Sequence, residues 1–222
     1  MYKNLNEWLA YIEKLHPTEI ELGLTRIAKV AKKLDLINFP ATVITVGGTN
    51  GKGTTCAFLE EILIQAGYKV GVYSSPHIQR FTERLRINHQ ELPDQMHCDA
   101  FEKIETAREN VSLSFFEYVT LSCLQLLKDQ QCDFIILEVG LGGRLDATNI
   151  VQSDISVITT IAIDHVDWLG DNREVIKALE NNQLATWPIT KEAVEKYLPD
   201  HASAMDKGLM RRQQQGLRST KT

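Results

Sequence analysis

A glycine-rich turn between a strand-like run and a helix-like run constrains this chain more than any other feature. Residues 41–46 are apolar and β-branched, and residues 54–66 have the periodicity of an amphipathic helix. The intervening glycines let backbone N–H groups point at an anion, the helix N-terminus adds positive potential, and Lys52 adds a full charge. The order therefore predicts a cradle for the phosphates of a nucleoside triphosphate.

The turn departs from the common pattern G-x-x-x-x-G-K-[ST]. The position six residues before Lys52 holds Val46 instead of glycine, and Gly53 follows the lysine, so that the hydroxyl comes one residue late, at Thr54. On these residues alone, a plain strand–helix turn with a surface lysine stays open as the alternative.

Strand-like and helix-like segments alternate along the chain. The expected strands are 42–46, 69–73, 133–138 and 155–159, with a short hairpin at 84–92. The expected helices are 4–16, 24–36, 54–66, 94–109 and 115–129. Runs that are apolar on both faces suit a buried parallel sheet, so we predict an α/β fold with a mostly parallel sheet and helices on both faces.

Composition limits the classes of function. The 222 residues carry a net charge of −5, which argues against non-specific nucleic-acid binding. The four cysteines lack C-x-x-C spacing and are expected to be apolar fillers. The absence of a signal peptide or a membrane-length apolar run leads us to expect a cytoplasmic protein, without membrane contact and monomeric.

Three side chains are expected at the edge of the sheet where the parallel strands end, which is where open α/β sheets bind ligands. Ser75 follows one strand, Glu138 ends another, and His165 follows the last. An acid at the end of an apolar strand is costly without a partner, and Mg²⁺ beside ATP is a suitable one. We therefore predict a metal site there.

Each of these residues also has an ordinary structural explanation. Glu138 could cap a helix or pair with Arg144, and Ser75 before a proline could be a turn residue. His165 is the weakest ligand for magnesium, which prefers oxygen, so it could instead be structural, act as a base or orient a water.

Two further segments could line the same site. The glycine-rich run 140–143 permits close approach to a ligand and is followed by Arg144 and Asp146, although it could be a flexible connector. Ser114 and Glu117 have the spacing of a capping box, so the aromatic pair between them could be core or a substrate wall.

The chain resembles the bifunctional dihydrofolate synthase/folylpolyglutamate synthase family of the Mur ligase superfamily. The segments that carry the resemblance are 48–54 (GTNGKGT), 73–77 (YSSPH), 80–84 (RFTER), 137–149 (LEVGLGGRLDATN) and 164–170 (DHVDWLG). It runs from about residue 5 to about residue 176. The resemblance implies an ATP-dependent amide ligase that uses Mg²⁺, activates dihydropteroate or a folate as an acyl phosphate, and joins it to L-glutamate.

The resemblance also assigns roles to individual residues. The phosphates of ATP would be held by Thr49, Asn50, Gly51, Lys52, Gly53 and Thr54. The metal would be held by Ser75, Glu138 and His165, and the catalytic residues would be Lys52, Glu138 and His165. The pteroate pocket would be lined by Glu19, Ile20, Glu21, Leu22, Ser114, Phe115, Phe116, Glu117, Leu145, Asp146 and Ala147.

The sequence departs from the family after about residue 176. Glu180 stands where many members carry a carbamylated lysine, and residues 177–222 are expected to be a divergent tail, partly helical and then disordered. We expect residues 1–176 to bind ATP and pteroate, the C-terminal glutamate-ligase domain to be absent, and residues 155–160 to form a sheet edge. Stand-alone activity is therefore uncertain, and a non-catalytic nucleotide-binding fragment or another Mur-type ligase remain alternatives.

Overall fold

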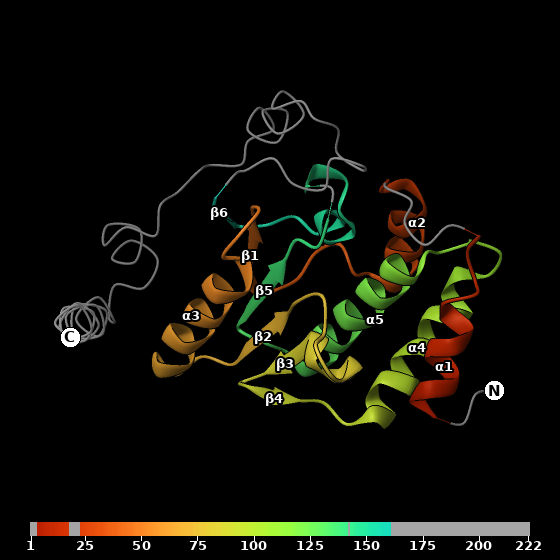
Figure 1. The fold of residues 1–222 in the computed structure, drawn as a ribbon, viewed down its shortest axis with the longest axis horizontal. Coiled ribbons are helices and arrows are strands. Elements are labelled where there is room, and N and C mark those ends of the chain that lie inside the picture. Colours follow the sequence, from red (N-terminus) through yellow and green to blue (C-terminus); the bar gives the residue numbers. More distant parts are fainter. Residues whose placement is uncertain (1–3, 18–22, 142, 161–222) are drawn as a thin grey trace, which may run out of the picture. The chain divides into compact units, whose positions relative to one another are not determined.

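Six strands form one mixed sheet in the order β4-β3-β2-β5-β1-β6 (Figure 1). The computed structural model describes residues 4–17, 23–141 and 143–160. The strands are β1 (Thr42–Gly47), β2 (Val70–Tyr73), β3 (Leu85–Ile87), β4 (Gln90–Glu91), β5 (Phe134–Glu138) and β6 (Ile155–Ile158). The helices are α1 (Leu5–Ile12), α2 (Thr25–Leu34), α3 (Lys52–Gln65), α4 (Asp94–Arg108) and α5 (Phe115–Gln130). Short 3-10 helices are η1 (Phe81–Arg84), η2 (Gly143–Leu145) and η3 (Ala147–Ile150).

The sheet is parallel across β2, β5, β1 and β6 and antiparallel where β3 and β4 are added at one edge. The predicted fold class is therefore confirmed, and so is the hairpin expected at 84–92. The sheet register pairs Val46 with Glu138 and Tyr73 with Leu137. Because these strands run the same way, the segments that follow β1 and β2 emerge beside the end of β5.

Helices cover both faces of the sheet, as Figure 1 shows for α3 and α5. On one face α3 contacts β5, β2 and β1 and buries Cys56 and Leu63. On the other face α5 lies against β2, where the Tyr73 hydroxyl and Thr120 Oγ1 form a hydrogen bond (3.0 Å), and α5 is backed by α4. Gly71 of β2 shows how closely α5 approaches, since a Cβ there would lie 2.3 Å from Leu127 Cδ2.

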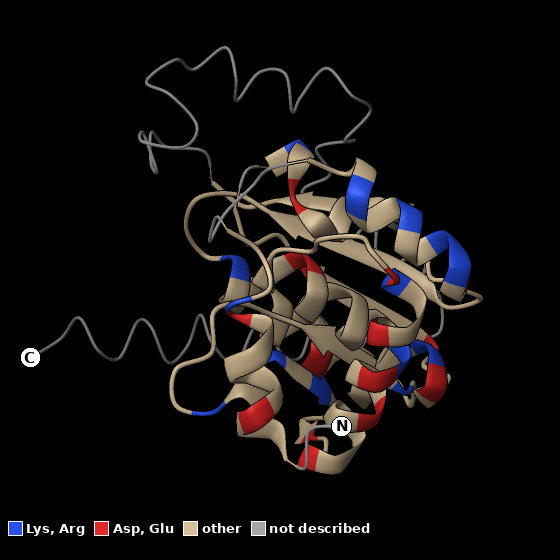
Figure 2. Ribbon diagram, turned by 90° about the vertical axis from the view of Figure 1, so that its right-hand side faces the viewer, with Lys and Arg blue, Asp and Glu red and all other residues tan. Residues whose placement is uncertain are grey.

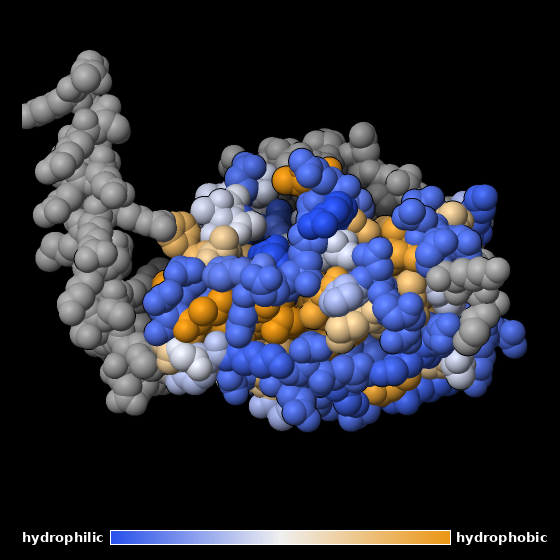
Figure 3. Space-filling view, turned by 90° about the horizontal axis from the view of Figure 1, so that it is seen from below, coloured by the Kyte–Doolittle hydropathy of each residue, from blue (hydrophilic) through white to orange (hydrophobic). Residues whose placement is uncertain are grey.

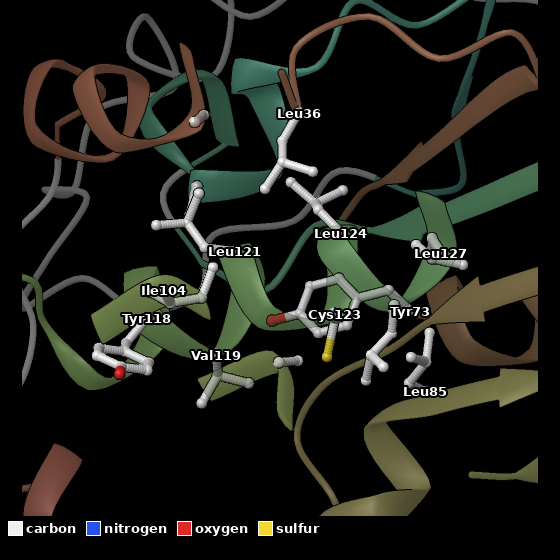
Figure 4. Packing of buried hydrophobic residues seen from close by; sticks show 14 of the residues in the cluster. Leu36, Tyr73, Leu85, Ile104, Tyr118, Val119, Leu121, Cys123, Leu124 and Leu127 are labelled. Carbon is white, nitrogen blue, oxygen red and sulfur yellow. The ribbon is translucent and has the colours of Figure 1, made fainter. Parts of the chain in front are cut away.

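The larger apolar core lies on the α5 side of the sheet. Figure 4 shows Leu121, Leu124 and Leu127 of α5 together with Tyr73 of β2 and Leu85 of β3. α5 is buried over most of its length, which explains why its sequence is apolar nearly all round instead of carrying one apolar stripe.

The largest difference from the expected boundaries is in α1, which was expected to reach residue 16 and ends at Ile12. Two other boundaries differ by two residues for local reasons. The helix expected from residue 54 begins at Lys52, because Gly51 takes a left-handed conformation (φ 86°) that glycine adopts without strain and ends the turn earlier. The helix expected to reach residue 36 ends at Leu34, where Asp35 is also left-handed (φ 54°). None of these differences changes the order of elements.

Charged residues are unevenly distributed over the surface. α2 carries Lys29, Lys32 and Lys33 on its exposed side, whereas acidic residues gather around α1 and α4 (Figure 2). The face seen from below is largely hydrophilic, with small apolar patches between polar side chains (Figure 3). Within the described residues, no helix has the length and apolar character required to cross a membrane.

His97 of α4 is a buried polar residue in this core. Its side chain is fully buried beside Phe81, with the two ring centroids 5.4 Å apart. Neither ring nitrogen has a hydrogen-bond partner among the described residues. Burial lowers the pKa of His97 from 6.5 to about 4, against a smaller opposing effect of Asp94 and Glu91.

We expect His97 to make the protein sensitive to acid. Between pH 6.5 and about 4 the unfolded chain binds a proton at this position that the folded chain excludes, so stability falls as the pH falls through that interval. A His97→Leu variant should lose this part of the pH dependence. Urea unfolding at several pH values measures this effect. If the free energy of unfolding of the variant falls below pH 6.5 as steeply as that of the unaltered chain, the acid sensitivity belongs to other groups.

Candidate nucleotide and metal site

The predicted phosphate cradle connects the end of β1 to the start of α3. Gly48 and Gly51 both have positive φ, 131° and 86°. Gly48 also has no room for a side chain, since a Cβ there would lie 2.2 Å from Thr159 Oγ1 and 2.9 Å from the Thr160 carbonyl oxygen. The glycines are therefore required both by the backbone path and by the close approach of the segment that follows β6.

The polar groups of the cradle are bonded within the chain. Lys52 Nζ donates to the carbonyl oxygens of Gly48 (2.8 Å) and Thr49 (3.2 Å). The N–H of Thr49 donates to the Thr160 carbonyl (2.6 Å), and the N–H of Asn50 donates to Thr160 Oγ1 (3.2 Å). Thr159 Oγ1 donates to the Asn50 carbonyl (2.7 Å).

Thr159 and Thr160 were not anticipated as part of the site. Their position gave a signal, because they follow β6 at the same edge of the sheet as the cradle, and β6 pairs with β1 up to Gly47. Residues at the ends of neighbouring parallel strands meet at one edge, so the two threonines after β6 could have been predicted to lie beside the cradle.

Glu138, the last residue of β5, lies beside the start of α3 at the same edge of the sheet. A Cβ placed on Gly53 would be 3.7 Å from Glu138 Oε1. Glu138 Oε2 accepts a long hydrogen bond from the Ser75 N–H (3.4 Å), and a Cβ placed on Gly140 would be 3.0 Å from Ser75 Oγ. The structure thus brings the start of α3, Ser75 and Glu138 together, as the strand register requires.

The electrostatics of Glu138 suit a cation. The residue is 6% exposed, and burial raises the pKa of its carboxyl group. The Ser75 N–H and the charges of Lys52 and Arg86 act in the opposite direction. Among the described residues, Oε1 accepts no hydrogen bond, so this carboxylate has capacity for a further partner.

The metal site stays a prediction, because the structure describes two of its three expected residues, Ser75 and Glu138. Ser75 and Glu138 offer a hydroxyl and a carboxylate, the oxygen ligands that Mg²⁺ prefers. The described residues include no group of three His, Cys, Asp or Glu side chains arranged to hold a metal, and His165 lies outside them. The alternative partner Arg144 is exposed and forms no ion pair with Glu138.

Asp146 holds the glycine-rich loop after β5 in place. Its Oδ2 accepts from the N–H groups of Gly140 (3.0 Å) and Leu141 (2.8 Å). Its Oδ1 accepts from the N–H (2.9 Å) and Oγ1 (2.7 Å) of Thr148. The carboxylate is buried, and its hydrogen bonds fix the backbone of Gly140, Leu141 and Thr148 relative to one another.

We expect an Asp146→Asn variant to lose stability. Asparagine has one acceptor oxygen, so whichever way its amide turns, its nitrogen faces either the N–H groups of Gly140 and Leu141 or the N–H of Thr148. Leaving such buried donors unpaired costs about 1–3 kcal/mol. The free energy of unfolding in urea measures the effect. The control Asp129→Asn disturbs an exposed ion pair with Lys103 (2.8 Å) and a hydrogen bond from Gln125 Nε2 (2.8 Å), which should together cost less than about 1 kcal/mol. Equal losses in the two variants would contradict the role of Asp146.

The capping box expected at residues 114–117 is confirmed. Ser114 Oγ accepts from the Glu117 N–H (3.3 Å), and Glu117 Oε2 accepts from the Ser114 N–H (2.8 Å). Glu117 also pairs with Arg26 (3.2 Å). Its other oxygen, Oε1, is buried and has no hydrogen-bond partner in the part of the chain that is described.

The other residues predicted to line a substrate pocket are only partly placed near the metal residues. A Cβ on Gly140 would lie 2.7 Å from the ring of Phe116, so this ring stands beside Ser75 and the glycine-rich loop. The guanidinium of Arg84 lies 5.7 Å from the centre of the Phe115 ring. Leu145 is exposed and Ala147 is buried. Residues Glu19, Ile20, Glu21 and Leu22 lie outside the described residues.

Known proteins resemble this chain over the region that contains these groups. Residues 46–181 match the family model of the Mur ligase middle domain. The dihydrofolate synthase/folylpolyglutamate synthases of Escherichia coli K12 and Haemophilus influenzae are each 59% identical over 172 residues, which is 78% of this chain. That match covers 41% of the first relative and 39% of the second, so the chain spans about two-fifths of their length.

Solved structures give the same result. E. coli FolC in complex with DHPP and ADP superimposes with a TM-score of 0.76 at 59% identity, covering 78% of this chain and 42% of that one. The Yersinia pestis bifunctional folylpolyglutamate synthase/dihydrofolate synthase complexed with AMPPNP and Mn has a TM-score of 0.74 at 58% identity, with the same shares covered. Since the family model matches more than half of the chain and the relatives match in sequence and fold, the chain belongs to the Mur ligase family and is homologous to the dihydrofolate synthase/folylpolyglutamate synthases.

Proposed function

We propose that this chain is the ATP-binding part of a ligase that adds L-glutamate to dihydropteroate or to a folate through an acyl phosphate. The observation that carries the proposal is the meeting of the glycine-rich turn and Lys52 with Ser75 and Glu138 at one edge of the sheet. It is supported by the identity of 59% to proteins whose structures contain ADP.

The proposed roles follow from charge and position. Residues 49–54 hold the phosphates of ATP through backbone N–H groups, and Lys52 stabilises negative charge while the phosphoryl group moves, which is the main requirement of such transfers. Ser75, Glu138 and His165 hold Mg²⁺, which supplies further charge stabilisation when bound. The oxygen donors of Ser75 and Glu138 and the unused capacity of Glu138 fit this ion.

The start of α5 and the loop around Asp146 line the pteroate pocket together with residues 19–22. The exposed Leu145, the Phe116 ring beside Ser75 and the unpartnered Oε1 of Glu117 support this placement. We place the boundary of the ATP- and pteroate-binding region at residue 176, followed by a divergent tail at 177–222.

The same proposal covers the surroundings of the protein. We propose a cytoplasmic monomer that binds neither nucleic acid nor membrane, in keeping with a net charge of −5. A second candidate is nucleotide binding without ligation, because the described residues supply a phosphate cradle and metal donors but no identified site for L-glutamate.

Two titrations and one assay separate these functions. Isothermal titration with Mg²⁺–ATP and with dihydropteroate tests the two binding sites, and phosphate release with and without L-glutamate tests turnover. Binding of both ligands with glutamate-dependent release supports the ligase. Binding without release supports the second candidate. A folded chain that binds no nucleotide would overturn both.

A further inference from the structure

Arg86 of β3 stands between the helix that follows the phosphate cradle and the loop that carries Ser75. The residue pairs with Val72 in the antiparallel β2–β3 register. Its side chain reaches α3 on one side and the end of β2 on the other, two elements that are not adjacent in the sequence.

On the helix side, Arg86 meets a buried acid. Its Nη2 donates to Glu60 Oε2 of α3 at 3.1 Å, and the side chains of Arg86 and Glu60 are 26% and 2% exposed. The other oxygen, Glu60 Oε1, accepts from the His89 N–H at 3.0 Å and lies 3.3 Å from His89 Nδ1. Glu60 is therefore held from two sides and fixes Arg86 relative to α3.

On the loop side, Arg86 meets the residue before Ser75. Its Nη1 donates to Ser74 Oγ at 3.3 Å and more weakly to the Glu83 carbonyl at 3.5 Å. The Ser74 N–H donates to the Arg84 carbonyl at 2.9 Å. The next residue is Ser75, whose N–H donates to Glu138. A continuous series of contacts thus runs from α3 through Arg86 to the candidate metal residues.

Stability alone gives little reason to place this ion pair here. The buried Glu60 and the partly exposed Arg86 both lose hydration, and apolar side chains of the same size often stabilise a protein equally well or better. The planar fork of arginine can instead hold two groups at a fixed angle, which lysine or an apolar residue cannot do. The feature that the pair adds is a fixed spacing between α3 and Ser74.

We propose that Arg86, held by Glu60, is a positioning residue that fixes Ser75 and Glu138 relative to the phosphate-binding start of α3. The role rests on the function proposed above, in which the metal joins these residues to the nucleotide. Arg86 acts through Ser74 and does not itself touch the ligand. Its loss should weaken the cooperation between metal and nucleotide more than the binding of nucleotide alone.

The test compares nucleotide affinity with and without metal in several variants of the full chain. ADP is titrated in the presence of Mn²⁺ and in the presence of a chelator. The coupling ratio is the dissociation constant of ADP with the chelator divided by that with Mn²⁺. Thermal unfolding measures stability separately. Arg86→Met should lower both the coupling ratio, by about 10- to 100-fold as for other groups behind a metal ligand, and the melting temperature.

The double variant Arg86→Met with Glu60→Met separates positioning from stability. Removing both charges should restore the melting temperature, because no unpaired buried charge remains. The coupling ratio should stay low, since the connection to Ser74 is still missing. Arg86→Lys, which keeps the charge but not the fork, should give an intermediate ratio.

The matched control is Arg80→Met. Arg80, just before η1, forms an ion pair with Glu91 of β4 at 2.9 Å, but its side chain is 71% exposed. This variant should change neither quantity. Recovery of the coupling ratio in the double variant, or an equal loss in Arg80→Met, would overturn the positioning role while leaving the proposed function intact. Failure of the unaltered chain to bind ADP would overturn the proposed function, and a chain that binds ADP without any effect of Mn²⁺ would overturn the metal site; either result removes the positioning role as well.

Discussion

A Lys52→Ala variant should bind ADP about 10- to 100-fold more weakly than the unaltered chain, since hydrogen bonds to charged groups contribute about 1.5–3 kcal/mol each. The fold should survive, because Lys52 is at the first turn of α3 and, within the described residues, its amine donates hydrogen bonds only to carbonyl groups of its own loop. Isothermal titration measures the affinity, and circular dichroism with thermal unfolding monitors the fold.

The control for this variant is Lys29→Ala. Lys29 is an exposed lysine of α2, so its removal changes the net charge by the same amount at a distance from the cradle. Its nucleotide affinity should match that of the unaltered chain. Equal affinities in all three proteins would remove the phosphate cradle from the proposal.

A Glu138→Gln variant should lose most of its response to divalent metal. Because loss of a group behind a metal ligand already lowers metal affinity about 10- to 100-fold, loss of the charge of a direct ligand should cost at least about 100-fold. The titration of Mn²⁺ into the ADP complex measures this. Glu83→Gln is a suitable control, because the carboxylate of Glu83 is exposed and accepts from the N–H groups of Ile78, Gln79 and Arg80. An unchanged Mn²⁺ titration in Glu138→Gln would exclude this residue as a ligand.

The same variant should be more stable than the unaltered chain when no ligand is present at neutral pH. Burial raises the pKa of Glu138, so the folded state binds a proton more readily than the unfolded state. Stability is therefore lost as the pH rises from the ordinary pKa of the group, 4.5, through its raised value in the folded chain. The advantage of Glu138→Gln should shrink on acidification, which urea unfolding across this interval would measure. A variant less stable than the unaltered chain at neutral pH would contradict the account.

The order of elements and the proximity of Ser75 to Glu138 could be predicted from the sequence because their signals are local. The apolar runs mark the strands, and the glycines, Lys52 and Glu138 lie within or directly after them. Because parallel strands end at one edge of a sheet, the positions of Ser75 and Glu138 at two strand ends predict that they lie close together. The exact start of α3 was missed because it depends on the left-handed conformation of Gly51.

The contacts that support the site were beyond this kind of prediction. Arg86 and Glu60 are 26 residues apart, and their pairing depends on how an antiparallel strand is added at the sheet edge. The contact between Asn50 and Thr160 spans 110 residues. A charged residue in a short strand and a hydroxyl after another strand have many possible partners, and only packing selects one. His165 and residues 19–22 lie outside the described residues, so their predicted roles stay predictions.

The N–H groups of Thr49 and Asn50 already donate hydrogen bonds to Thr160, so a bound nucleotide would have to replace these bonds with its own. A phosphate that takes these donors releases partners already present, so the measured affinity is the difference between two sets of bonds and not the full strength of the new ones. A substitution of Thr160 can therefore raise or lower the affinity for a nucleotide even if residue 160 makes no contact with the nucleotide.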